Sequence, residues 1–145
     1  MADAAKPTKG QFDTNWLDGV YMSSPIGAFA MQFALHRDDD DGPQVFIVKF
    51  PPDYEVPPHS HSCDYLSVVL EGSLVSTRKH YPVGAVRFVR ADTGYGPLKY
   101  GPEGCTLLEV FARTSGVKAT PLRASDQARF DEISQELAFR RQVPD

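Results

Sequence analysis

The sequence predicts an all-β domain, a barrel or sandwich, that ends in one α-helix. Several short segments with strand character follow one another at close spacing, and glycine- and proline-rich turns separate them. This rhythm is typical of antiparallel sandwiches and barrels. Near the C-terminus the pattern changes to the helical spacing of Phe130, Ile133 and Leu137. The 145 residues suffice for one domain with a substantial core.

The first strands are predicted to form a hairpin. Residues 27–36 are apolar and compatible with helix or strand, but a turn signal follows them and residues 45–50 have strand composition. The two segments together therefore favour a hairpin. The acidic run 38–41 within the turn lacks the spaced oxygen ligands of a calcium loop and is interpreted as solvated. Further strands are expected at 73–79, 85–89 and 105–111.

The C-terminal segment predicts a helix over residues 126–141. Ser125 is placed to cap its start, where Asp126 suits the positive end of the helix dipole. Arg140 and Arg141 suit the other end. The apolar stripe either packs against the outside of the barrel or contacts a second subunit. The first is favoured, because amphipathic helices usually cover a core.

Composition excludes several classes of function. A net charge of −4 gives no basis for binding nucleic acid or an anionic membrane. No apolar stretch is long enough to cross a bilayer, and the N-terminus lacks the build of a secretion signal. Two cysteines do not make a disulfide framework, so a cytoplasmic protein is expected. The sequence contains no nucleophile elbow, no phosphate-binding loop and no zinc-protease helix motif.

The most informative segment is Pro57-Pro58-His59-Ser60-His61, followed by an apolar run that ends at Gly72. Side chains two residues apart on an extended segment project from the same face, so His59 and His61 should lie side by side. Two neutral imidazoles side by side can serve as nitrogen ligands to one divalent metal ion. His59 and His61 are therefore candidate metal ligands.

These residues resemble the first motif of the cupin superfamily, Gly-x5-His-x-His-x3/4-Glu-x6-Gly. The resemblance covers roughly residues 45–112, with His59 and His61 at the histidine positions and Gly72 at the closing glycine. It implies a small, RmlC-like fold of one domain: a cupin-like jelly-roll β-barrel with one C-terminal α-helix.

The resemblance also implies how the chain is divided and how it assembles. We expect an N-terminal arm of residues 1–24, a cupin-like barrel of residues 25–115, and a C-terminal linker and amphipathic helix of residues 116–145. Barrels of this kind often cover exposed strand edges by pairing with a second copy, so a homodimer is expected.

The metal-binding motif is degenerate. Tyr65 stands where the family has its glutamate, and Tyr95 stands at the histidine position of the second motif, Pro-x-Gly-x2-His. Two of the four family ligands remain, whereas typical sites supply three or four. Nearby, Arg87 and Arg90 have opposite strand parity, so at most one points inward. The missing ligands could come from Tyr65, Tyr95, Cys63, Asp64, His36 or His80.

By resemblance, the leading hypothesis is a small enzyme that acts on an organic metabolite in the barrel mouth. His59 and His61 would hold a divalent metal ion (iron, zinc, nickel or manganese), while Tyr65 and Tyr95, the candidate catalytic residues, complete the metal shell or position substrate. Dioxygenases, isomerases and lyases all occur on this scaffold, so the fold does not choose among them. The alternatives are a metal-free barrel that binds or senses a small molecule, and a metal-free acid–base catalyst that uses the histidines and tyrosines.

Overall fold

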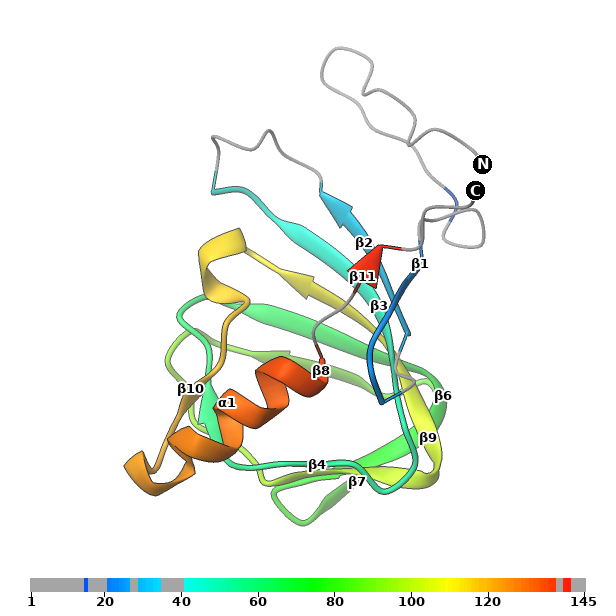
Figure 1. Cartoon of the computed structure of the whole chain (residues 1–145). Coiled ribbons are helices and arrows are strands. Elements are labelled where there is room, and N and C mark those ends of the chain that lie inside the picture. The colour runs from blue at the N-terminus through cyan, green and yellow to red at the C-terminus, as the bar shows by residue number, and fades with distance from the viewer. Residues whose placement is uncertain (1–14, 16–20, 27–28, 35–40, 138–139, 142–145) are drawn as a thin grey trace.

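The structure, a computed structural model, describes residues 15, 21–26, 29–34, 41–137 and 140–141. Strands dominate it, and one α-helix follows them (Figure 1). The elements are β1 (Tyr21–Ser23), β2 (Phe29–Ala34), β3 (Gln44–Phe50), β4 (Glu55–Val56), β5 (His59–Ser60), β6 (Tyr65–Ser76), β7 (Lys79–Tyr81), β8 (Val86–Val89), β9 (Leu98–Phe111), β10 (Thr120–Pro121), α1 (Gln127–Glu136) and β11 (Arg140–Arg141), with short 3-10 turns at Thr114–Gly116 and Ala124–Asp126.

The main sheet has the strand order β11-β1-β2-β3-β9-β6-β7, with β4 beside β9 and β8 beside β6. Its pairs are antiparallel, and β5 and β10 form a second, two-stranded sheet. The predicted hairpin is confirmed as β2 and β3, in which Phe29 pairs with Lys49 and Ala34 pairs with Gln44. Of the arm predicted for residues 1–24, the described part contains β1, which joins the sheet beside β2. The predicted all-β barrel with one helix is confirmed.

Strands β6 and β9 form the longest pair and fix which residues face inward. They run together from Tyr65 opposite Phe111 to Ser76 opposite Leu98, with register shifts on either side of Gly72. Gly72 has a φ of 73°, and a Cβ there would lie 2.0 Å from the carbonyl oxygen of Gly104. The closing glycine of the sequence motif is therefore required both by its backbone conformation and by the close approach of β9.

The core lies on the inner face of the sheet. The ring of Phe50 stacks on that of Tyr100, with centroids 4.1 Å apart. Both cysteines are buried and free of disulfides, and Cys105 behaves as a small apolar residue within β9. In the part of the chain that the structure describes, no helix is long and apolar enough to cross a membrane.

The C-terminal helix is shorter than the predicted 126–141. Ser125 belongs to the preceding 3-10 turn rather than to a cap, and α1 ends at Glu136, since the next residue, Leu137, has non-helical dihedral angles. Beyond it, β11 pairs with β1, so the segment expected to end the helix is a strand. Pairing with β1 gives this backbone ladder hydrogen bonds, which explains why the helix does not continue.

Helix α1 lies across the open end of the barrel, and the expectation that it packs against the outside is wrong (Figure 1). Phe130 and Ile133 are each only 7% exposed and face the barrel interior. The hydroxyl of Tyr54 donates a hydrogen bond to the Glu136 carboxylate at 2.7 Å, which ties the end of α1 to the barrel. The neighbouring strands β4 and β5 have two residues each, so this end of the barrel needs another element to cover its apolar interior.

Candidate functional site

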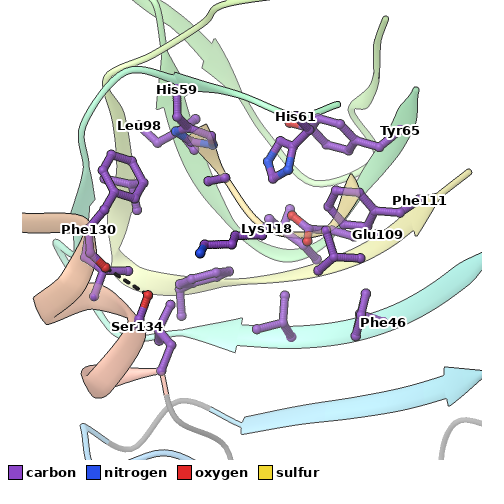
Figure 2. Close-up of a pocket in the computed structure, with 18 of the residues that line it drawn as sticks. Phe46, His59, His61, Tyr65, Leu98, Glu109, Phe111, Lys118, Phe130 and Ser134 are labelled. Carbon is purple, nitrogen blue, oxygen red and sulfur yellow. Dashed lines mark hydrogen bonds between the residues drawn. The ribbon is translucent and has the colours of Figure 1, made fainter. Parts of the chain in front are cut away.

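The barrel and α1 enclose a cavity of about 480 Å³ (Figure 2). Its walls are largely apolar and include the rings of Phe46, Phe111 and Phe130. A cavity of this size with few polar groups is typical of a site for a small organic molecule. The polar side chains that carry its chemistry are His59, His61, Tyr65, Arg87, Tyr95 and Glu109.

His59 is held with its hydrogen on Nδ1. Its backbone forms an antiparallel bridge with Tyr95, and its Nδ1 lies 2.8 Å from the carbonyl oxygen of Pro57, which can only accept a hydrogen bond. Nε2 therefore accepts a hydrogen bond from the hydroxyl of Tyr95, at 2.9 Å. Burial lowers the pKa of His59 to about 4, so the ring is neutral at physiological pH.

His61 has the same tautomer, and no side chain of the described residues donates a hydrogen bond to its second ring nitrogen. Its Nδ1 donates to the carbonyl oxygen of Gly116 at 2.9 Å. The ring also interacts with the backbone of Val117, makes no hydrogen bond to another side chain of the described residues, and points into the cavity (Figure 2). Burial lowers the pKa of His61, so the second ring nitrogen keeps its lone pair at neutral pH.

Tyr65 and Tyr95 connect Arg87 to His59. Nη2 of Arg87 donates to the hydroxyl oxygen of Tyr65, and Tyr65 donates in turn to Tyr95. Together with the hydrogen bond from Tyr95 to His59, these bonds form a chain in which each group donates to the next, from the guanidinium of Arg87 to the imidazole of His59. Burial raises the pKa of Tyr65 to about 12 and raises that of Tyr95 further, so both phenols keep their protons.

Arg87 and Glu109 lie on one row of the inner face, separated by Ser67. In the sheet register Ser67 is opposite Arg87 on β8 and opposite Glu109 on β9. The guanidinium lies over the rings of three tyrosines, the nearest being Tyr95 at 4.8 Å. Arg90, by contrast, is exposed, as the parity of the strand requires.

Glu109 is a carboxyl group in an apolar cavity. Its side chain points into the cavity near His61 (Figure 2), and it makes no hydrogen bond or ion pair with another described residue. Burial raises the pKa of Glu109 to about 7, although the charge of Arg87 opposes this shift. Near neutral pH the group can therefore both give and take a proton.

The four site residues of the sequence analysis come together at one end of the cavity. The ring centroids of His59 and His61 are 5.2 Å apart, and Tyr65 and Tyr95 are joined by a hydrogen bond. The other candidate ligands lie elsewhere: Cys63 contacts the carbonyl oxygen of Arg113, Asp64 is exposed and accepts from the amide of Ala91, His80 is exposed on β7, and His36 lies outside the described residues.

These residues do not fit a metal centre with three or four protein ligands. The Nδ1 contacts of both histidines to backbone carbonyls are usual for metal-binding imidazoles. However, the Nε2 atom of His59 is occupied by Tyr95, and the phenols keep their protons. Within the described ranges, no three His, Cys, Asp or Glu side chains come together in a way that could hold a metal ion.

Two polar residues of the cavity, Arg87 and Glu109, were not predicted as site residues. One signal in the sequence points to Glu109. It has the same strand parity as Leu107 and Phe111, which are both apolar, so a carboxyl is placed on a face that should be buried. Strand parity shows that at most one of Arg87 and Arg90 points inward. That Arg87 is the inward one depends on the pairing of β8 with β6.

Comparisons with known proteins identify the fold. The sequence matches no protein-family model and no curated protein sequence. Among solved structures, the polyketide cyclase RemF from Streptomyces resistomycificus is similar with a TM-score of 0.61 at 16% identity, over 86% of this chain and 96% of that one. An RmlC-like cupin from Shewanella frigidimarina gives a TM-score of 0.57 at 16% identity, over 70% of this chain and 89% of that one. KdgF from a Halomonas species gives a TM-score of 0.53 at 17% identity, over 72% of this chain and 94% of that one. The cupin jelly-roll fold expected from the sequence motif is confirmed.

Proposed function

We propose that this cupin-fold protein is an enzyme that transfers protons on a small, mostly apolar carbonyl compound bound in the cavity. The observation that carries the proposal is the pairing of two groups. The imidazole of His61 and the carboxyl of Glu109 both face one apolar cavity, and neither makes a hydrogen bond to another side chain of the described chain (Figure 2). A proton acceptor and a proton donor that face one cavity are the parts that acid–base catalysis needs.

The reaction needs no further reactant. Nε2 of His61 takes a proton from the carbon next to the carbonyl group, and the electrons of the C–H bond form a carbon–carbon double bond. The carbonyl oxygen then takes the proton of Glu109, which gives an enol and a carboxylate. Return of a proton from His61 to the same or another carbon, together with return of the enol proton to the Glu109 carboxylate, restores the carbonyl group and completes an exchange or an isomerisation.

The predicted catalytic residues, Tyr65 and Tyr95, serve in this proposal as positioning groups. Their hydroxyls are fixed by the hydrogen bonds from Arg87 and to His59, and both residues line the cavity. A rigid polar wall beside an apolar one orients a substrate that has a single polar end. The occurrence of a polyketide cyclase with this fold agrees with catalysis on an organic molecule.

Exchange of α-hydrogen for deuterium tests the proposal without knowledge of the natural substrate. The protein is incubated in deuterated buffer with enolisable aryl ketones such as 2-tetralone and 1-indanone, and exchange is followed by NMR. We expect exchange above the buffer rate, reduced about a hundredfold or more in His61→Ala and Glu109→Gln. His80→Ala, at an exposed histidine on β7, is the matched control. If ketones bind without exchange, the protein is a binding barrel and the proposal fails.

A metal-dependent enzyme, the form that the resemblance predicted, is the second candidate. It is favoured by the tautomers of His59 and His61, since both Nδ1 atoms donate to carbonyl oxygens. Elemental analysis of protein purified without an affinity tag or chelator tests it. Near-stoichiometric iron, zinc, nickel or manganese that is lost in the His59→Ala/His61→Ala double variant would favour this candidate.

The homodimer and the cytoplasmic location also stay predictions. Light scattering, which measures the mass of the protein in solution, tests the homodimer.

A further inference from the structure

We infer that the cavity binds a small organic anion, with its charged group at the end formed by Arg87 and Tyr65 and its apolar body on the phenylalanine wall. The inference deepens the proposed function, on which it rests for the identity of the site. It names the charge of the ligand, whereas proton transfer alone does not require a charged substrate.

The first step is that Arg87 forms no ion pair with any carboxylate in the part of the chain that the structure describes. Its only hydrogen bond goes to the neutral hydroxyl of Tyr65, and it belongs to none of the ion pairs of the described residues. Its Nε and Nη1 atoms are buried without any hydrogen-bond partner. Aromatic faces offset part of this cost, but removing a cation from water without an anion is strongly unfavourable. The cavity is therefore incomplete without negative charge.

The second step is that Glu109 does not supply that charge. It is the carboxyl nearest to Arg87 along the inner row, yet Ser67 and a whole strand separate the two residues. The two side chains form none of the ion pairs found among the described residues, although the charge of Arg87 is felt at Glu109 and lowers its pKa against the effect of burial. Both side chains line the cavity.

The third step is the charge of the other groups that face Glu109. His59, His61, Tyr65, Tyr95 and Tyr100 are neutral at pH 7, because burial lowers the pKa of the imidazoles and raises that of the phenols. At the exposed edge, Lys118 and Asp131 carry opposite charges. When Glu109 holds a proton, Arg87 therefore leaves the interior with one net positive charge. Binding of an anion should favour that protonated state, so the complex should take up a proton.

A matched pair of ligands tests this inference. We use 2-naphthoate and 2-naphthamide, which have the same apolar body and nearly the same shape but differ in charge, and measure affinity by calorimetry at a pH of about 6. We expect the anion to bind about tenfold more tightly or better. Above pH 7 its affinity should fall by up to about tenfold per pH unit, and calorimetry in two buffers should report proton uptake.

Variants show which residues cause the preference for the anion and the proton uptake. Arg87→Met keeps an apolar stem without the charge, and it should remove the preference for the anion. Arg90→Met, at the exposed arginine three residues away, should keep it. Glu109→Gln should remove the proton uptake.

The matched ligands decide the question even if Arg87→Met does not fold. Equal affinity of the wild-type protein for the two naphthalenes would overturn the inference. Ketone exchange without a preference for the anion would refute this inference alone, and a preference for the anion without exchange would refute the proposed function alone.

Discussion

Replacement of Glu109 by glutamine should change how the stability of the protein depends on pH. The pKa of Glu109 is raised from 4.5 to about 7 in the folded protein, because its carboxylate is buried in an apolar cavity. Between these values the folded state holds a proton that the unfolded state has released. The contribution of Glu109 to the free energy of unfolding is therefore full below pH 4.5, falls as the pH rises, and is lost above pH 7.

The size of the change in the free energy of unfolding follows from the shift in the pKa of Glu109. Each pKa unit corresponds to about 1.4 kcal/mol, so the wild-type protein should lose about 3 kcal/mol through Glu109 between these limits. His59 acts in the opposite direction, because burial lowers its pKa from 6.5 to about 4 and stability then rises with pH in that window. These two contributions are of similar size, and His61, whose pKa burial also lowers, acts in the same direction as His59. Glu109→Gln removes the contribution of Glu109 and should reveal that of the histidines.

Urea unfolding followed by circular dichroism, in steps from about pH 4 to pH 8, measures this difference. The free energy of unfolding of Glu109→Gln relative to the wild type should increase by about 3 kcal/mol across the range. Glu103→Gln, at an exposed position on the same strand, controls for the loss of one charge. A difference between Glu109→Gln and the wild type that does not vary with pH would refute the reasoning, since it would mean that the carboxylate is solvated in the folded protein.

Three further substitutions and one control at the surface test the packing of the site. Tyr95→Phe removes a hydroxyl from the middle of the hydrogen-bonded chain and should cost about 1–2 kcal/mol in urea unfolding, whereas an unchanged midpoint would show that the chain adds no stability. Gly116→Ala would bring a Cβ within 2.2 Å of the sulfur of Cys63, so we expect a lower melting temperature and a shifted NMR signal of the neighbouring imidazole. Phe130→Ala should cost about 3 kcal/mol or more in thermal unfolding, because it enlarges an existing cavity. Phe88→Ala, at a ring that is 60% exposed, should cost less than about 0.5 kcal/mol, and equal losses in the two would contradict the placement of α1.

The part of the site that the sequence predicted comes from short-range geometry. His59 and His61 are two residues apart on an extended segment, so their relation depends only on the backbone between them. Tyr65 follows on the next strand, at a position that the family motif defines. Tyr95 lies beside His59 because their backbones pair, which agrees with its alignment to the second motif.

The remaining parts depend on contacts between distant segments. Arg87 and Glu109 share a row only because β8 and β9 flank β6 in one particular register, and a shift of one residue would turn both side chains outward. The position of α1 depends on which end of the barrel stays uncovered, since its apolar stripe would suit either surface. Periodicity identifies a buried face, but it does not identify the partner of that face.

Because one wall of the cavity is a helix, substitutions in that helix can change which ligand binds while the barrel stays the same. A helix satisfies its backbone hydrogen bonds internally, so an exchange of Ile133, Ser134 or Leu137 changes the shape of the cavity without disturbing a strand ladder. The polar row on β6, β8 and β9 has no such freedom, since each of its members also sets the register of neighbouring strands. We therefore expect relatives of this protein to keep the chemistry of the row while they vary the helix, and to differ in what they bind more than in what they do to it.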